Sequence, residues 1–320
     1  MDIALITGIT GQDGAYLSQL LLNKGYTIIG ITRNNSTLDI SKLGYLGIEK
    51  EILIEECDLL NLSQIIAIIS KYRPTEIYNL SAQSSVFVSF KEPIETIQNN
   101  FLSVVNFLEA IRVVNDKIKF FQAASSEIYG DFNNLPITEN SIFHPLSPYA
   151  ISKASAQWFC INYRESYNLF VSNGILFNHE SYLRSNNFFI KKVIRAAIAI
   201  SQNKQDVLKV GNIDVERDFG YAPKYVEAMY LIMQHAIPDD FIICSGVSIS
   251  LREIIEYIFE KLAIDKDKIS IDKSLYRPTD VKQIYGSNEK IKTMLGWEYS
   301  FHFFQILDLL LEEELKNQIN

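Results

Sequence analysis

The N-terminal segment repeats an apolar run, a glycine-rich turn, a helix-like stretch and a second apolar run, and this pattern constrains the fold more than any other part of the chain. The two strand-like runs and the helix between them fall at residues 3–7, 26–32 and 15–23. Short apolar runs joined through a helix need a parallel sheet to bury them. The sequence therefore predicts that the chain begins with a βαβ unit.

The same alternation continues to about residue 177. Further strand-like segments lie at residues 51–56, 76–79, 118–124 and 169–176. Helical periodicity lies between them at residues 62–71, 93–114 and 149–167. Strands that alternate with long helices are typical of a parallel sheet covered on both faces. We therefore predict a Rossmann-type, doubly wound α/β domain over residues 1–177.

Beyond residue 177 the pattern loosens. Short strands are predicted at residues 207–210 and 241–244, and helices at residues 188–201, 225–234 and 251–261. Polar loops separate these segments. The pattern predicts a smaller C-terminal α/β lobe over residues 178–320 that binds substrate at the carboxyl edge of the sheet, with parts of it returning to that sheet.

Composition excludes some partners. The chain has 320 residues, a formal net charge of −8 and 48% hydrophobic residues, which permits a full core but argues against nucleic acid or an anionic membrane as a partner. Cys57, Cys160 and Cys244 are far apart and lack metal-site or disulfide spacing, so we expect buried free thiols and no metal. There is no signal-peptide pattern and no apolar stretch of about 18 residues, which predicts a cytoplasmic protein.

Three glycines, Gly8, Gly11 and Gly14, directly follow the first predicted strand. Glycine allows the backbone to turn tightly and approach a pyrophosphate, and the N-terminus of the next helix favours the negative charge. A plain strand-to-helix turn is the alternative. The complete βαβ context favours dinucleotide binding.

The end of the second strand discriminates between cofactors. NAD enzymes usually have an acidic residue there, whereas this chain has Thr32 and Arg33. An arginine can pair with a 2′-phosphate, which favours NADP over NAD, although a solvent-facing arginine is the alternative. After the third strand, Asp58 and Leu59 are placed to contact the adenine edge, or Asp58 caps the next helix.

Tyr149 and Lys153 lie four residues apart and share one face of a predicted helix, which Ser147 and Pro148 are expected to begin. An unperturbed tyrosine titrates near ~10, too high for a base at neutral pH. A neighbouring ammonium and the nicotinamide charge would lower that pKa. The pair is therefore predicted to exchange a proton with a sugar hydroxyl. Lys153 is also predicted to hold the nicotinamide ribose.

Ser125, Ser126 and Glu127 follow the fifth predicted strand. Ser125 is placed to hydrogen-bond a sugar C4 hydroxyl and to complete a proton network with Tyr149, while Ser126 helps position the substrate. Glu127 would remove the C5 proton once C4 is a ketone, after which hydroxide can leave C6. A turn glutamate is the alternative. The carboxylate favours a dehydratase over a simple dehydrogenase.

Several longer motifs resemble those of the GDP-mannose 4,6-dehydratase family of extended short-chain dehydrogenase/reductases. The resemblance runs from Ala4 to about Trp297. The motifs that carry it are Gly8-Ile-Thr-Gly-Gln-Asp-Gly14, Asn79-Leu-Ser-Ala-Gln-Ser84, Ser125-Ser-Glu-Ile-Tyr-Gly130, Ser147-Pro-Tyr-Ala150, Asn162-Tyr-Arg-Glu-Ser-Tyr-Asn-Leu-Phe170, Asn173-Gly-Ile-Leu-Phe-Asn-His-Glu-Ser181, Glu216-Arg-Asp-Phe-Gly220 and Tyr276-Arg-Pro-Thr-Asp280.

By this resemblance, Ser125 takes the family's threonine position, Glu127 is the C5 base, and Tyr149 with Lys153 forms the redox pair. Besides the three glycines, Arg33, Tyr149 and Lys153, the implied cofactor contacts are Thr10, Gln12, Asp13, Asp58, Leu59, Leu80, Ala82, Ser84, His179 and Arg184. The implied substrate contacts are Ser84, Ser85, Ser126, Asn178, Lys192, Arg217, Arg277 and Asp280.

The resemblance also implies the reaction and the assembly. GDP-mannose would be oxidised at C4, lose water across C5 and C6, and receive the hydride at C6 as GDP-4-keto-6-deoxy-mannose. NADP would be regenerated in each turnover and stay bound. A homodimer or homotetramer would form through the helices at residues 93–114 and 149–167.

The chain departs from the family pattern at several positions. Asn34 stands where a second arginine is usual, which leaves NAD possible, and Ser85 replaces a histidine near the sugar pocket. The smaller Ser85 could admit a GDP-linked manno-heptose. Three further functions compete with the dehydratase: a sugar-nucleotide 4-epimerase, a 4-keto reductase and a non-catalytic dinucleotide sensor. Glu127 argues against the first two, and Tyr149 with Lys153 argues against the third.

Overall fold

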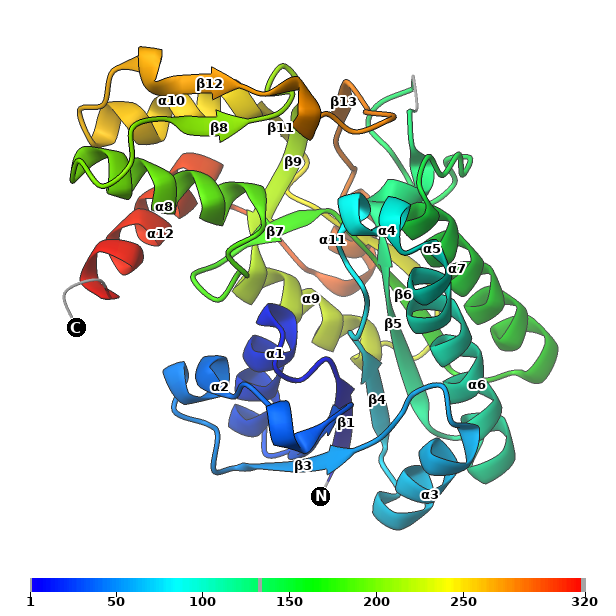
Figure 1. Cartoon of the computed structure of the whole chain (residues 1–320). Coiled ribbons are helices and arrows are strands. Elements are labelled where there is room, and N and C mark those ends of the chain that lie inside the picture. The colour runs from blue at the N-terminus through cyan, green and yellow to red at the C-terminus, as the bar shows by residue number, and fades with distance from the viewer. Residues whose placement is uncertain (1, 132–133, 318–320) are drawn as a thin grey trace.

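One parallel sheet of seven strands forms the centre of the computed structural model, which describes residues 2–131 and 134–317 (Figure 1). The strand order is β3-β2-β1-β4-β5-β6-β10, and all neighbours pair in parallel. The strands are β1 (Ile3–Thr7), β2 (Thr27–Thr32), β3 (Ile52–Glu56), β4 (Glu76–Asn79), β5 (Lys119–Ser125), β6 (Val171–Leu176) and β10 (Asp240–Ile243). This confirms the predicted Rossmann-type fold.

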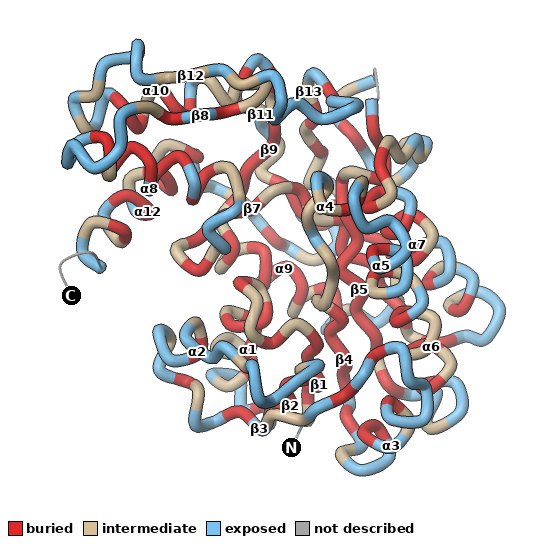
Figure 2. The backbone as a smooth tube through the Cα atoms, in the orientation of Figure 1, coloured by how far each residue is buried: buried red, intermediate tan, exposed pale blue. Residues whose placement is uncertain are grey.

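Helices cover both faces of the sheet. On one face, α1 (Gln12–Asn23) packs against α9 (Ala222–Gln234), and their buried side chains include Leu17 and Met229. On the other face lie α3 (Leu62–Tyr72), α6 (Ser103–Val114) and α7 (Pro148–Tyr167), with Phe107 and Cys160 in their core. Figure 2 shows the central strands buried beneath these helices. Each large apolar side chain buried in this way contributes roughly 1.5–3 kcal/mol before chain entropy is counted.

A smaller lobe stands over one end of the sheet (Figure 1). Its strands are β7 (Asn178–Glu180), β8 (Leu208–Val210), β9 (Glu216–Tyr221), β11 (Ser248–Ser250), β12 (Ile269–Ile271) and β13 (Gln283–Ile284). Its helices are α8 (Phe189–Ser201), α10 (Leu251–Lys261) and α12 (Phe303–Asn317). Ile194, Phe259 and Leu307 are buried among them in a separate core.

Parts of the chain after residue 178 belong to the sheet rather than to this lobe. β10 pairs in parallel with β6 at the sheet edge, and α9 packs on α1. The short helix α11 (Glu289–Leu295) contacts both α9 and β10. The lobe is therefore built from separate stretches of sequence.

The segment at residues 93–114 is not one regular helix. After α4 (Val86–Lys91), the structure has α5 (Pro93–Ile97), a π-helical turn (Gln98–Leu102) and then α6. Asn100 lies in the widened turn, and its buried amide contacts Gln83 and Ser152. A π turn of this kind often marks a functional position.

Several short elements complete the described chain. Besides α2 (Ser41–Tyr45), they are 3₁₀ turns at Asn35–Thr37, Ser126–Tyr129, Lys266–Lys268 and Lys273–Leu275. Cys57, Cys160 and Cys244 are buried free thiols, as predicted. Within residues 2–131 and 134–317, no helix combines the length and the apolarity that crossing a membrane requires.

Candidate active site

The glycine turn after β1 leaves no room for side chains. Gly8 has φ +67°, and a Cβ there would lie 3.0 Å from the carbonyl carbon of Leu80. A Cβ on Gly14 would lie 2.3 Å from the carbonyl oxygen of Gly8, and Gly11 N donates to that oxygen at 2.9 Å. The turn thus brings bare backbone to the N-terminus of α1. This shape and polarity fit a dinucleotide pyrophosphate.

Thr7 fixes the loop that faces the glycine turn. Its Oγ1 donates to Asn79 Oδ1 at 2.6 Å and accepts from the backbone N–H groups of Leu80 and Ser81 at 3.1 and 3.0 Å. The carboxyl ends of β1 and β4 are therefore tied together. Of the predicted cofactor contacts in this loop, Leu80 and Ala82 are half-buried and Ser84 is exposed.

Asn100 is a site-forming residue that the sequence reasoning missed. Its Oδ1 accepts from Gln83 N at 2.8 Å, and its Nδ2 donates to Gln83 O and Ser152 Oγ at 3.0 and 3.1 Å. It therefore joins the loop after β4 to α7, which carries Tyr149. Asn100 follows two other polar residues, Gln98 and Asn99, so the sequence carried no signal that singled it out.

Asp13 and His179 are both predicted cofactor contacts, and in the structure they bind one another. His179 Nε2 lies 2.9 Å from the Asp13 carboxylate, and Nδ1 lies 2.8 Å from Phe177 O. Burial alone would raise the pKa of Asp13, but the charge and hydrogen bond of His179 bring it below the ordinary value. Gln12 supports this contact by donating to His179 O at 3.2 Å. Thr10 lies half-buried in the same turn.

Arg184 lies near the same pair. Its Nε is 3.6 Å from Glu180 Oε1, and its guanidinium stacks 3.6 Å from the centroid of the Phe188 ring. Burial raises the pKa of Glu180, while the positive charge of Arg184 opposes that rise. The positive charge of Arg184 also lowers the pKa of Asp13 and opposes the rise in the pKa of Tyr149.

The predicted adenosine contacts lie at the ends of β2 and β3. Arg33 is exposed and forms no hydrogen bond or ion pair with any residue in the described ranges. Asp58 does not cap α3: its Oδ1 accepts from Leu60 N at 3.0 Å, and Asn61 is the N-cap. Leu59 is buried against the core on the α3 side of the sheet.

Tyr149 and Lys153 lie on α7, and Ser147 caps this helix by accepting from Ala150 N at 3.1 Å, as predicted. Lys153 Nζ donates to Ala123 O at 2.8 Å and lies 6.0 Å from the centroid of the Tyr149 ring. Burial lowers the pKa of Lys153 to about 8.

The expected lowering of the tyrosine pKa is not present in the protein alone. Burial raises the pKa of Tyr149 to about 12, because the buried phenolate is poorly solvated. A hydrogen bond with Ser125 and the positive charge of Arg184 oppose this rise, while the Glu127 carboxylate adds to it. The Lys153 ammonium is not one of the groups that shift this pKa.

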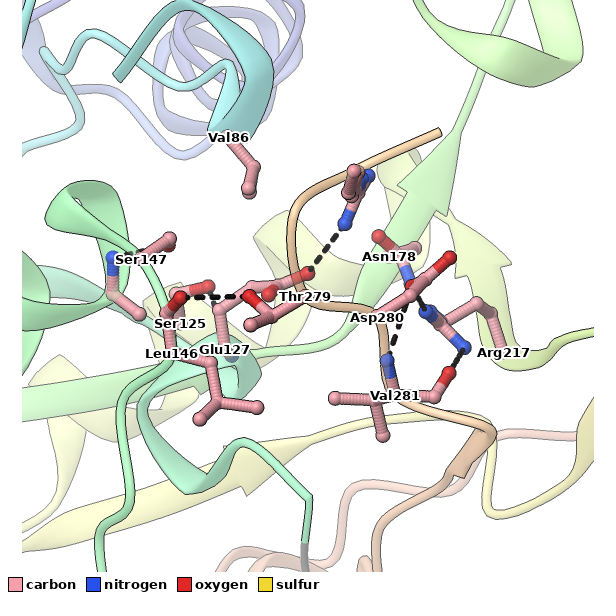
Figure 3. Close-up of polar contacts among 12 residues, drawn as sticks. Val86, Ser125, Glu127, Leu146, Ser147, Asn178, Arg217, Thr279, Asp280 and Val281 are labelled. Atoms are coloured by element: carbon pink, nitrogen blue, oxygen red, sulfur yellow. Dashed lines mark hydrogen bonds and ion pairs between the residues drawn. The ribbon is translucent and has the colours of Figure 1, made fainter. Parts of the chain in front are cut away.

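Ser125 and Glu127 lie where β5 ends in a 3₁₀ turn. Glu127 N donates to Ser125 Oγ at 3.3 Å, while Ser126 between them is buried. The Glu127 side chain lines a small cavity, open to solvent, together with Ser147, Arg217, Arg277, Thr279 and Asp280. Figure 3 shows Ser125, Glu127 and Ser147 on one side and Arg217 and Asp280 on the other.

Two arginines face this cavity. Arg277 Nη1 lies 3.7 Å from Glu127 Oε1. Arg217 is buried, its Nη2 lies 2.7 Å from Asp280 Oδ1, and its Nη1 donates to Val281 O at 2.7 Å. Asn178 lies beside them in Figure 3 and donates to Asp218 O at 3.3 Å. The cavity therefore combines a carboxylate base with cationic groups suited to phosphate.

Some predicted substrate contacts lie outside this cavity. Lys192 is exposed, donates to Lys209 O at 2.8 Å and lines a separate, wide-open hollow of about 700 Å³ beside α8. Ser85 is the N-cap of α4 and accepts from Val88 N at 3.3 Å. Of this region only Val86, the residue after Ser85, lines the Glu127 cavity.

Several solved structures share this fold. UDP-glucose 4-epimerase from Thermotoga maritima, solved with UDP-glucose, is 23% identical and has a TM-score of 0.88, covering 99% of both chains. The dTDP-glucose 4,6-dehydratase from Bacillus anthracis in complex with NAD is 20% identical with a TM-score of 0.87, covering 99% of this chain and 97% of the other. RMD from Pseudomonas aeruginosa, complexed with NADPH, is 24% identical with a TM-score of 0.83 over 99% and 100% of the two chains.

Sequence comparison is more specific than these structural matches. The profile of the GDP-mannose 4,6 dehydratase family matches residues 5–310. GDP-mannose 4,6 dehydratase 1 from Arabidopsis thaliana is 40% identical over 98% of this chain and 90% of its own length. GDP-mannose 4,6-dehydratase from Sinorhizobium fredii is 37% identical over 98% and 96%. The chain, which carries the predicted motifs at the carboxyl edge of its sheet, therefore belongs to the GDP-mannose 4,6-dehydratase family.

Proposed function

We propose that the protein is a hydro-lyase that converts GDP-mannose to GDP-4-keto-6-deoxy-mannose. One observation carries the proposal: the Glu127 carboxylate lines a cavity two residues after Ser125, and the Ser125 hydroxyl acts on the pKa of the buried Tyr149. An oxidation at C4 needs only the tyrosine side of this arrangement. The carboxylate beside it supplies the additional base that elimination requires.

The proposed cofactor is a nicotinamide dinucleotide held by Gly8, Gly11 and Gly14 at the N-terminus of α1. We assign NADP rather than NAD, because Arg33 is exposed at the end of β2 with its guanidinium available to a 2′-phosphate. The bound nicotinamide supplies a hydride acceptor for C4, a donor for C6, and a positive charge beside Tyr149. Asp13, His179 and Arg184 line the approach to the cradle and complete the proposed contacts.

Tyr149 moves the proton at the sugar O4. The Ser125 hydrogen bond and the charge of Arg184 both favour its phenolate, against burial. Ser125 then connects the phenol to the C4 hydroxyl, so that the proton leaves O4 as the C4 ketone forms. Lys153 donates to Ala123 O on β5. This bond ties the tyrosine-bearing helix α7 to β5, and so holds Tyr149 beside Ser125.

Glu127 performs the elimination. A C4 ketone makes the C5 proton acidic, and Glu127 removes it, so the C5–H bond breaks toward the carboxylate. The C6–O bond then breaks, and the departing hydroxide takes the proton that Glu127 removed from C5 and leaves as water. The hydride taken from C4 would return to C6, and a proton equivalent to the one that Tyr149 took from O4 would return to C5, which gives the 6-deoxy sugar.

The GDP portion is assigned to the smaller lobe. Arg217 and Arg277 are the proposed diphosphate ligands, with Asn178, Ser126 and Asp280 around the sugar and Lys192 at the more distant hollow. Accordingly we assign catalysis and most cofactor contacts to residues 1–177, with His179 and Arg184 added from the start of the second segment, and most substrate contacts to the rest of residues 178–320, with Ser126 added from the sheet domain.

The test is to incubate the purified protein with NADP and GDP-mannose and to record product mass and nicotinamide absorbance together. A dehydratase gives a product lighter by one water with no net change in absorbance. A 4-keto reductase would instead consume NADPH, and a 4-epimerase would leave the mass unchanged. GDP-manno-heptose serves as a parallel substrate. The Arabidopsis thaliana and Sinorhizobium fredii relatives are both named GDP-mannose 4,6-dehydratases, which does not favour the heptose.

We further propose a homodimer through the outer face of α5 and α7. Ile94, Ile151, Trp158 and Phe159 are exposed there, with Trp158 58% exposed. Several exposed apolar side chains on two helices that contact one another favour an interface there. Sedimentation should show a dimer or tetramer that Trp158→Glu dissociates, while a monomeric wild type contradicts the assignment.

The acidic charge and the three buried free thiols support a cytoplasmic location.

A further inference from the structure

Four charged side chains meet at the Glu127 cavity, and their charges balance. Glu127 pairs with Arg277 at 3.7 Å, and Asp280 pairs with Arg217 at 2.7 Å. All four residues line the same cavity. A substrate diphosphate that enters this cavity adds negative charge and competes with both carboxylates for the arginines.

The two arginines differ in how firmly they are held. Arg217 is buried and donates to Glu216 O, Val281 O and Asp280 Oδ1 at 2.7–2.8 Å. Arg277 is 38% exposed, and within residues 2–131 and 134–317 its single ionic contact is the 3.7 Å approach to Glu127. Arg277 is therefore the arginine that can change partners at little cost.

We propose that Arg277 exchanges the Glu127 carboxylate for the diphosphate when the nucleotide binds, and so releases Glu127 for its role as a base. This inference rests on the proposed function and deepens it. A diphosphate has more charge and more acceptor oxygens than one carboxylate, so it wins the competition for a guanidinium. Arg277 then acts as a positioning residue: it keeps Glu127 engaged in the free protein and withdraws from it once a GDP-sugar is in place.

The exchange predicts an unusual binding result. If Glu127 competes with the diphosphate for Arg277, the Glu127→Gln variant should bind GDP more tightly than the wild type. The expected gain is about two- to fivefold in Kd, which corresponds to the loss of one partly exposed ion pair. The gain should disappear in the Arg277→Gln background and be partly retained with Arg277→Lys, which keeps the charge.

The experiment is a double-mutant cycle measured with GDP alone by titration calorimetry, on the NADP-loaded protein. Asp214→Asn is the matched control: it also removes one negative charge from the protein, but from a 70% exposed side chain paired with Arg252, and it should leave the Kd unchanged. A gain that persists without Arg277 means direct repulsion between Glu127 and the diphosphate, which overturns the exchange. A Glu127→Gln variant that binds GDP no better than wild type also overturns it.

These outcomes are independent of turnover. If the wild type fails to dehydrate GDP-mannose, the proposed function fails whatever the cycle shows. If the wild type dehydrates GDP-mannose but the cycle shows no coupling, only the exchange fails. A structure with GDP bound adds a direct readout, in which the Arg277–Glu127 contact should be broken and the guanidinium should contact a phosphate.

Discussion

His179 on β7 and Asp13 at the start of α1 are 166 residues apart in sequence, yet their side chains meet at 2.9 Å beside the glycine turn. Both ring nitrogens of His179 face oxygen atoms, because Nδ1 lies 2.8 Å from Phe177 O. The pair joins the first helix of the sheet domain to the first strand of the smaller lobe. It therefore sets where the lobe stands relative to the cofactor cradle.

Asp13→Asn should lower the free energy of unfolding by about 1–3 kcal/mol, the range for losing a charge-assisted hydrogen bond at a buried site. Because the pKa of Asp13 is below its ordinary value of 3.8 in the folded state, this contribution is present above that pH and is lost as the pH falls through the folded pKa. Urea denaturation of the wild type and the variant at several pH values measures this contribution to the free energy of unfolding. Asp13→Asn and His179→Gln should be non-additive; full additivity would show that the two residues act separately.

Gly14→Ala should abolish cofactor binding and destabilise the fold by about 1–3 kcal/mol, because its Cβ would meet Gly8 O at 2.3 Å. Gly44→Ala is the matched control, since nothing lies within 4 Å of a Cβ there and the residue is in α2. That variant should be neutral or more stable by up to about 1 kcal/mol. Thermal unfolding and NADP titration check both. Equal effects at the two positions would contradict the tight cradle.

Arg33→Ala should weaken NADP by about tenfold or more while changing NAD little, because only NADP has a 2′-phosphate for the guanidinium. The control is Arg112→Ala. Arg112 is also an exposed arginine but lies on α6, so its loss should change neither affinity. Fluorescence titration with both dinucleotides gives the ratio. Equal losses for NADP and NAD would remove the basis for preferring NADP.

Glu127→Gln should retain NADP binding and GDP-mannose binding but form deoxy product at least ~10²-fold more slowly, the usual loss for a positioned base. Oxidation at C4 does not need the carboxylate, so a small amount of reduced cofactor should accumulate. Rapid-mixing absorbance together with product mass measures both effects. Wild-type rates of product formation from this variant would refute the assigned role.

The lowered pKa of Lys153 should make the free energy of unfolding depend on pH. Burial lowers its pKa to about 8 from 10.5, so between these values the unfolded chain binds more protons than the folded one. The free energy of unfolding should therefore gain roughly 3 kcal/mol from this group as the pH rises through that window. Lys153→Met should lack the gain. Urea titrations of the cofactor-free protein at three pH values would detect it, and parallel pH profiles for the two proteins would contradict it.

Local sequence was sufficient for much of the fold. The strand at residues 3–7, the glycine turn and the helix start at Ser147 all depend on residues close together in the chain. Glycine conformations, capping hydroxyls and apolar runs act over a few residues, so their meaning can be read without a partner. The order of the catalytic motifs along β5 and α7 also places them at one edge of a parallel sheet.

Long-range packing decided the rest. The π turn that presents Asn100 to Gln83, the pairing of Arg277 with Glu127 and the rise in the Tyr149 pKa each depend on segments brought together only by folding. A motif specifies which functional group is present, but burial and the nearest charges set its pKa and its partner. The sequence alone therefore determined the family, the sheet and the chemical groups of this protein. Its tertiary structure determined which of those groups are paired in the free protein, because charges distant in sequence interact only when the folded chain excludes water and holds them within a few ångströms.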